Sequence, residues 1–200
     1  MAILDSFPEY YAKDRAAWRK WLEKNHSKEK GVWLIYYKKS SDKTRVTWVD
    51  AVKEALCFGW IDSTSRPIDE ERYKQAFMPR KPKSGWSGKN KLYVTELEKE
   101  GLITSAGLAA IEIAKKNGNW NKLDHVEAAI VPEDLEKALA KSKIATTYFD
   151  SLGKTNRFYL LHWLNSAKRE ETRKIRIATI MEALREKKMP DRFVRKPKEG

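Results

Sequence analysis

Apolar positions follow helical spacing in some segments of the chain and strand spacing in others. Over residues 14–25, Trp18 and Leu22 repeat at the spacing of one helical face, and Asp14 is a suitable N-cap. The following segment, 31–37, is apolar at both odd and even positions and rich in aromatic and β-branched residues. This pattern predicts a helix followed by a strand that is buried on both faces.

The middle of the N-terminal half predicts one helix and two more strands. Thr47-Trp48-Val49-Asp50 resembles a capping box with Asp in place of the usual Glu, and the helix that it opens should end at Gly59. Two strands are expected at about 60–66 and 72–78, with the turn between them at 67–70.

Beyond the loop that follows the second of these strands, everything has helical spacing. Ser87 and Ser105 are expected to cap two helices, and Pro132 suits the first position of another. Further helices are expected at about 143–151, 155–167 and 170–187. The fold class is therefore α+β and mostly helical. A small antiparallel sheet near 31–38, 60–66 and 72–78 belongs to the N-terminal half, and the C-terminal half is helical.

The same pattern indicates a domain boundary in the region 118–131. We expect an α/β region over 1–120 and a helical region over 130–190. The last residues, 190–200, are rich in Pro, Lys and Arg and predict a flexible basic tail.

Composition adds a charge imbalance to this picture. The 200 residues include 41 Lys and Arg against 28 Asp and Glu, a net charge of +13, and 41% are apolar with 8 Trp. This apolar content supplies a core, and the charge favours a polyanionic partner or serves solubility alone. The single cysteine, Cys57, fits a reducing compartment. We find neither a signal peptide nor an apolar run long enough to span a bilayer, so the expected location is cytoplasmic.

The positive charge is concentrated between residues 72 and 91, where seven Lys and Arg occur without any Asp or Glu. Glycines and a tryptophan within this stretch are features of an anion-binding loop at a helix N-terminus. The segment matches neither the P-loop nor the dinucleotide-binding pattern. The alternative is a solvated loop with its tryptophan in the core. The predicted ligand-binding residues are Arg80, Lys83, Ser84, Trp86, Ser87, Lys89 and Asn90.

A second basic cluster opens the last long helix. Arg169, Arg173 and Arg176 share one helical face and could contact phosphates, with Lys168 beside them. The alternative is an ordinary solvated helix start, in which Glu170 pairs with Lys174 four residues later. Lys168, Arg173 and Arg176 are secondary candidates.

The sequence predicts no catalytic residue, metal site or cofactor. Cys57 lies between apolar neighbours, which is typical of a buried thiol, and the three histidines do not have metal-ligand spacing. Asp62 and Glu54 are the carboxylates that could act as acid or base beside the basic loop. Asp62 is accordingly a further secondary candidate.

Several blocks of the chain resemble the YdeI/OmpD-associated family of bacteriocin-protection proteins. The residues that carry the resemblance are Glu54 to Ser63, Pro79 to Ser84 with Trp86, Ser87 and Asn90, and Phe149, Leu152, Tyr159, Trp163, Ala167-Lys168, Glu171-Thr172-Arg173 and Ile177. Together these blocks span most of 14–187.

The resemblance implies a soluble protein of a largely uncharacterised family. The family name implies protection against bacteriocins or cationic antimicrobial peptides and a porin-related partner, and no catalytic residues can be carried over. A chain of net charge +13 repels cationic peptides, so an indirect role through an anionic ligand fits better than direct capture.

Three hypotheses of function follow. The first is a non-enzymatic protein that binds an anionic small molecule through the basic loop and is linked to antimicrobial resistance. The second is a nucleic-acid-binding protein that uses both basic clusters. The third is an enzyme acting on a phosphorylated small molecule, with Asp62 or Glu54 as the acid–base group.

Overall fold

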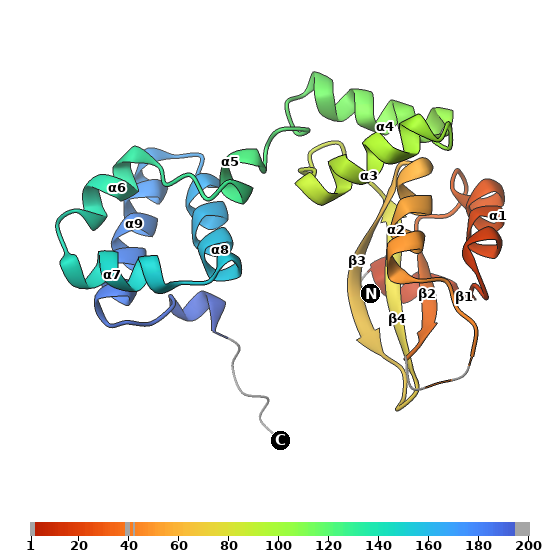
Figure 1. The fold of residues 1–200 in the computed structure, drawn as a ribbon, viewed down its shortest axis with the longest axis horizontal. Coiled ribbons are helices and arrows are strands. Elements are labelled where there is room, and N and C mark those ends of the chain that lie inside the picture. Colours follow the sequence, from red (N-terminus) through yellow and green to blue (C-terminus); the bar gives the residue numbers. More distant parts are fainter. Residues whose placement is uncertain (1–2, 39–40, 42, 195–200) are drawn as a thin grey trace. The chain divides into compact units, whose positions relative to one another are not determined.

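The computed structural model describes residues 3–38, 41 and 43–194 (Figure 1). The chain divides into unit 1, Met1–Lys122, and unit 2, Leu123–Gly200. The structure is 53% helical and 13% strand, and its four strands all belong to unit 1. The predicted α+β class is confirmed. Within the predicted tail at 190–200, residues from 195 onward lie outside the described residues.

Unit 1 contains a four-stranded sheet with the order β1-β2-β4-β3. The strands are β1 (Glu9–Tyr11), β2 (Val32–Tyr37), β3 (Trp60–Pro67) and β4 (Arg72–Pro79). The pairs β2–β4 and β3–β4 are antiparallel, as predicted. The sheet as a whole is mixed, because β1, which the sequence did not predict, adds a parallel edge in which Tyr10 lies opposite Leu34. Three residues are too few to show a strand pattern in sequence.

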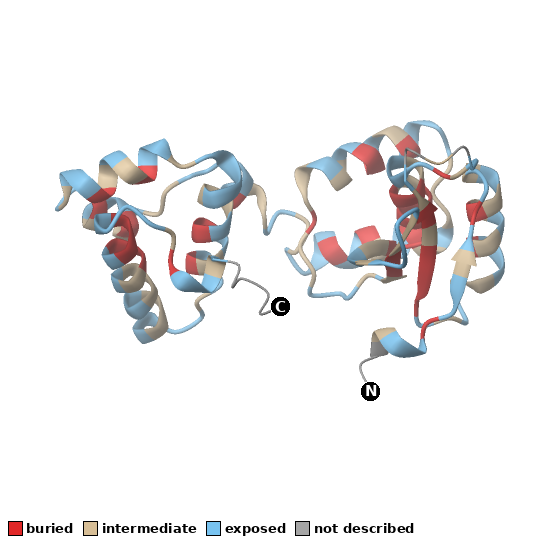
Figure 2. Cartoon of the chain, turned by 90° about the horizontal axis from the view of Figure 1, so that it is seen from below, coloured by how far each residue is buried: buried red, intermediate tan, exposed pale blue. Residues whose placement is uncertain are grey.

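Strand β2 is buried on both faces, as its sequence predicts (Figure 2). Leu34 and Tyr36 belong to the main core, which the sheet shares with the helices of unit 1. Trp33 points to the other face, where it packs with Phe7 and Ala76. A short 3-10 helix (Ile3–Ser6) precedes Phe7. The alternation of side chains along a strand thus gives β2 two apolar environments.

Four helices complete unit 1: α1 (Arg15–Asn25), α2 (Trp48–Cys57), α3 (Gly88–Lys99) and α4 (Ser105–Lys116). The predicted N-caps Asp14, Thr47 and Ser87 each accept a hydrogen bond from the backbone N–H three residues later. The fourth prediction was wrong by one residue, because the side chain of Thr104 caps α4 in place of Ser105.

Helix α4 begins in close contact with the end of α2. The Thr104 hydroxyl donates to the carbonyl of Cys57 at 2.7 Å, and a Cβ at Gly107 would lie only 2.3 Å from that same oxygen. Gly59, at φ 72°, turns the chain from α2 into β3, and a Cβ there would lie 2.9 Å from the Ala106 carbonyl. Two glycines therefore permit the approach that brings α4 against the turn before β3.

The described residues of unit 2 form helices and no strand, as predicted for the C-terminal half. The helices are α5 (Asp124–Glu127), α6 (Glu133–Leu139), α7 (Lys143–Ser151), α8 (Lys154–Asn165) and α9 (Glu170–Arg185), followed by the 3-10 helix Asp191–Phe193. Helix α9 packs against α6, α7 and α8, and the unit has its own core, which includes Leu135, Phe149, Leu160 and Leu184. Pro132 is the N-cap of α6 and not its first residue.

Candidate functional site

The predicted basic loop connects β4 to α3 and is held at both of its ends. The Arg80 N–H donates to the Gly59 carbonyl at 2.9 Å, and the Ser87 hydroxyl caps α3 by accepting from the Asn90 N–H at 3.2 Å. In its middle, the side chains of Asn117 and Asn119 both donate to the Pro82 carbonyl. The turn after α4 therefore sets the conformation of this loop.

Trp86 is a core residue, with 1% of its surface exposed. Its ring lies against Trp120, with the two ring centroids 5.0 Å apart, and the Arg80 guanidinium carbon lies 3.8 Å from the Trp86 centroid. Of the two readings that the sequence left open, a core tryptophan or a ligand-contacting one, the burial favours the core. Trp86 nevertheless also borders a cavity.

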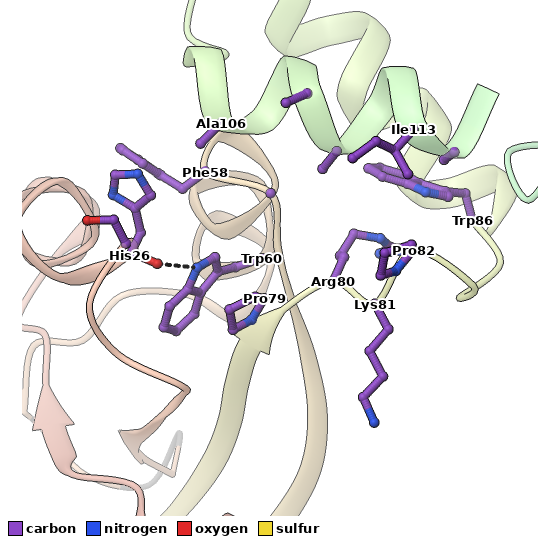
Figure 3. A pocket seen from close by; sticks show the side chains of 15 residues that line it. His26, Phe58, Trp60, Pro79, Arg80, Lys81, Pro82, Trp86, Ala106 and Ile113 are labelled. Atoms are coloured by element: carbon purple, nitrogen blue, oxygen red, sulfur yellow. Dashed lines mark hydrogen bonds between the residues drawn. The ribbon is translucent and has the colours of Figure 1, made fainter. Parts of the chain in front are cut away.

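This cavity, of about 340 Å³, lies between α4, the turn that precedes β3 and the loop that follows β4 (Figure 3). Its lining is mostly apolar. The lining residues are His26, Ser27, Phe58, Gly59, Trp60, Pro79, Arg80, Lys81, Pro82, Trp86, Ala106, Ala109, Ala110, Ile113 and Ala114. The volume is at the small end of the range of ligand pockets, about 300–1,000 Å³.

Two polar contacts order the wall of the cavity opposite the loop. The Trp60 indole N–H donates to the His26 carbonyl at 3.2 Å, and His26 Nδ1 lies 2.8 Å from the Leu22 carbonyl (Figure 3). Because a carbonyl can only accept, His26 Nδ1 carries the proton in that contact. The His26 ring packs on Phe58, with the centroids 5.0 Å apart.

Arg80 is the charged group that this cavity partly buries. Its Nη2 donates to the Gly85 carbonyl at 2.9 Å, whereas its Nε and Nη1 are buried and have no hydrogen-bond partner among the described residues. Burial lowers the pKa of the Arg80 guanidinium to about 10, against the opposing effect of the Asp62 charge. A buried cation with unused donors is unfavourable by itself, and it is also ready to receive an anion.

Of the seven predicted ligand-binding residues, Arg80 and Trp86 line this cavity and the other five do not. The Ser84 hydroxyl donates to the Lys81 carbonyl, and Ser87 with Asn90 forms the helix cap. Lys89 Nζ lies 5.1 Å from the centroid of the Trp48 ring, toward α2. The Lys83 side chain is exposed.

The sequence reasoning missed the residues that α4 and the Phe58–Trp60 turn bring to the cavity. Ala106, Ala110 and Ala114 follow one another at helical spacing, and this stripe of small side chains was the available signal for a close approach. Nothing in the sequence connects His26 to Arg80, because the two are joined only through the fold.

Neither carboxylate of the enzyme hypothesis lines the cavity. Glu54 is buried and forms ion pairs with Arg15 and Arg19, the latter at 2.7 Å. Asp62 accepts from the Trp48 indole N–H at 3.2 Å, and burial raises the pKa of this carboxyl. Neither Glu54 nor Asp62 therefore provides an acid–base group in the cavity beside Trp86.

The second predicted cluster lies in unit 2, and there its arginines bind the protein itself. Arg173 forms an ion pair with Asp134, with Nη2 2.9 Å from Oδ1, and this joins α9 to α6. Arg176 donates to the Trp163 carbonyl and, at 2.8 Å, to the Ser166 hydroxyl. Lys168 is exposed. The proposed phosphate-binding stripe therefore consists largely of side chains that fasten helices together.

The part of the chain that the structure describes shows neither a metal-binding group of side chains nor a reactive thiol. There, no three His, Cys, Asp or Glu side chains lie together in a way that could hold a metal ion. Cys57 is buried, and its burial raises the pKa of the thiol to about 11, which disfavours the reactive thiolate.

Comparison with family models assigns the two units differently. Residues 10–110 match the model described as "Domain of unknown function (DUF8412)", which covers half of the chain. The chain belongs to this family. Residues 128–187 match the model described as "Bacteriocin-protection, YdeI or OmpD-Associated".

The predicted YdeI/OmpD-associated resemblance is thereby confirmed for the C-terminal region. The blocks at 54–63 and 79–90, which the sequence analysis attributed to the same family, lie instead within the DUF8412 match. Neither the curated proteins nor the solved structures gave a match to this chain. Among the described residues, no helix combines the length and apolar character that crossing a membrane would require.

Proposed function

We propose that unit 1 binds a small organic anion in the cavity bordered by Arg80 and Trp86. The observation that carries the proposal is the Arg80 guanidinium, whose Nε and Nη1 are buried without a partner among the described residues. An anion in this cavity would offset the burial that lowers the pKa of Arg80, and a small rotation of the guanidinium would let it accept from these two N–H donors, which the protein now covers.

The remainder of the lining describes the rest of the ligand. Phe58, Trp60 and Ile113 offer apolar surface, and the described lining contains neither a carboxylate nor a thiol. A molecule with one carboxylate or phosphate group and an apolar body of small size fits this combination. Free inorganic phosphate would use the guanidinium but leave the apolar wall unfilled.

The proposed role is binding and not catalysis. The proposed location is the cytoplasm, because a single cysteine fits a reducing compartment. The family matched by residues 128–187 adds the context of bacteriocin protection. Since a net charge of +13 disfavours direct capture of cationic peptides, we propose that the protein contributes to that protection indirectly, through binding of the anionic ligand. A porin-related partner stays a prediction from the family name.

Calorimetric titration of the full chain with benzoate, octanoate, inorganic phosphate and the neutral analogue benzamide tests the proposal. We expect the organic carboxylates to bind at least about tenfold more tightly than benzamide, because a hydrogen bond to a charged group is worth about 1.5–3 kcal/mol. Arg80→Met should remove that preference. The matched control is Arg66→Met, since Arg66 also packs on a tryptophan, Trp33, but lies outside the cavity.

A second variant tests the cavity without changing its charge. Ala110→Leu adds bulk to the α4 wall and should weaken octanoate and benzoate alike. Tight binding retained in both Arg80→Met and Ala110→Leu would refute the site, and so would the absence of carboxylate binding by the folded wild type.

A further inference from the structure

Two segments without acidic residues, distant in the sequence, lie side by side in unit 1. Residues 79–91 carry five Lys and Arg and residues 113–123 carry three, and neither segment contains Asp or Glu. The first runs from the end of β4 into α3, and the second from the last turn of α4 to the end of unit 1 (Figure 1). Only the first was singled out by the sequence pattern.

Hydrogen bonds and ring contacts hold these two segments together. Asn117 and Asn119 donate to the Pro82 carbonyl at 2.8 and 3.1 Å, and Lys122 Nζ donates to the Lys83 carbonyl at 3.2 Å. The rings of Trp86 and Trp120 meet beneath them. These contacts bring the lysines of both segments near one another on the surface of unit 1. The fold determines their relative positions.

We call this the basic surface and define it by five exposed lysines: Lys81, Lys83, Lys115, Lys116 and Lys122. None of the five forms an ion pair with an acid among the described residues. Elsewhere in the chain lysines do find acids, as in the pairs Lys53–Glu96 and Lys174–Glu170. The basic surface thus keeps a positive charge that no ion pair among the described residues compensates.

We propose that the basic surface binds the phosphate backbone of nucleic acid. Several lysines spread over two segments suit a repeating polyanion better than a single small anion. The lysines are separated by polar residues, including Asn117, Asn119 and Asn121, and a single large apolar side chain of the two segments, Ile113, is exposed. Attachment to a lipid surface by an amphipathic face would require several such side chains.

This site differs from the one predicted from sequence for the same class of partner. That prediction combined the basic loop with the arginines of α9, which unit 2 engages through Asp134 and the Trp163 carbonyl. The present site replaces them with Lys115, Lys116 and Lys122, which the sequence alone did not connect to the loop.

The test measures binding of fluorescently labelled DNA and RNA, single strands and duplexes of about 20 nucleotides, by anisotropy between about 50 and 200 mM salt. With five phosphate contacts, we expect log Kd to depend on log salt with a slope of magnitude about 3.5 for single strands and about 4.5 for duplexes. The variant Lys83→Gln/Lys115→Gln/Lys116→Gln should weaken binding at low salt at least about tenfold and reduce the slope by about 2–3.

The control variant removes the same charge elsewhere in unit 1. Lys13, Lys20 and Lys24 are also exposed, and Lys24 matches Lys116 by lying in the last turn of its helix. Lys13→Gln/Lys20→Gln/Lys24→Gln should keep both the affinity and most of the slope.

Each other outcome overturns the proposal. Equal losses in the two triple variants would mean that net charge alone attracts the DNA or RNA. A flat salt response, the absence of binding, or tighter binding to vesicles of phosphatidylserine and phosphatidylcholine would do the same. Arg80→Met should leave oligonucleotide binding unchanged within about twofold, which separates this site from the cavity.

Discussion

The two basic clusters of this chain look alike in sequence and differ in the folded protein. In unit 2, Arg173 and Arg176 are engaged by Asp134, the Trp163 carbonyl and Ser166. In unit 1, Arg80 uses one nitrogen on the Gly85 carbonyl and leaves two donors without a partner among the described residues. A cluster of cations therefore does not mark a ligand site by itself.

What separates the clusters is the supply of acceptors from elsewhere in the chain. Asp134 is 39 positions before Arg173 and reaches it because α6 packs on α9. Around Arg80 the fold instead supplies Trp86 and the apolar wall of the cavity. Removing one partner of a buried ion pair destabilises a fold because it leaves an uncompensated charge, and a buried charge that has no partner carries that cost until a ligand arrives.

The largest expected effect concerns a buried charge that is fully partnered. Glu54→Gln would leave Arg15 and Arg19 without the carboxylate that they share, and we expect unit 1 to lose about 2–3 kcal/mol of unfolding free energy. Urea unfolding followed by tryptophan fluorescence measures this, because seven of the eight tryptophans lie in unit 1.

The control for this variant is Glu96→Gln, which breaks the partly exposed pair with Lys53 and should cost about 0.5 kcal/mol. A loss no larger for Glu54→Gln than for Glu96→Gln would show that burial adds nothing to the value of the partnered charge.

A matched pair of substitutions compares the two clusters directly. Arg173→Met removes the ion pair to Asp134 and should destabilise unit 2 by about 1–2 kcal/mol. Arg80→Met should change the stability of unit 1 by less than about 1 kcal/mol, since the loss of the bond to Gly85 is offset by removal of a buried unpaired charge.

Urea titration followed by amide NMR spectra reports both units in the same chain without added ligand. An Arg80→Met loss as large as that of Arg173→Met would contradict the comparison. It would mean that Arg80 acts as a structural residue.

The smallest expected effect is on the pH dependence of stability, to which Asp134 in unit 2 and Asp62 in unit 1 should contribute with opposite sign. The Arg173 hydrogen bond lowers the pKa of Asp134 below its ordinary 3.8, so its contribution to stability is present above that pH and is lost as pH falls. Burial raises the pKa of Asp62, so its contribution is present at low pH and is lost as pH rises through the raised pKa.

The same NMR titration, carried out between about pH 3 and 6, should show that Asp134→Asn flattens the profile of unit 2 and Asp62→Asn that of unit 1, each by less than about 1 kcal/mol. If Asp134→Asn and Asp62→Asn changed the pH dependence of stability with the same sign, the assignment of these two environments would be contradicted.

Local features of the fold were readable from the sequence because they depend on residues close to one another. The caps at Asp14, Thr47 and Ser87 each involve a backbone N–H only three positions away. The run of apolar residues at both odd and even positions of 31–37 indicated the two buried faces of β2. Strand β1 escaped prediction because its place in the sheet depends on a parallel pairing with β2, 24 positions later at Glu9 and Trp33.

The candidate site was predictable only in part, for the same reason. Sequence alone indicated the segment around Arg80 and Trp86, because an acid-free stretch and its tryptophan are local facts. The tertiary structure decided the rest. It brought α4 against the Phe58–Trp60 turn and attached Asn117 and Asn119 to the loop. It also gave Arg173 an ion pair with an acid, whereas Arg80 has none among the described residues. The sequence determines which residues are charged. Whether a charge is paired, buried or accessible to a ligand depends on which distant segments pack beside it.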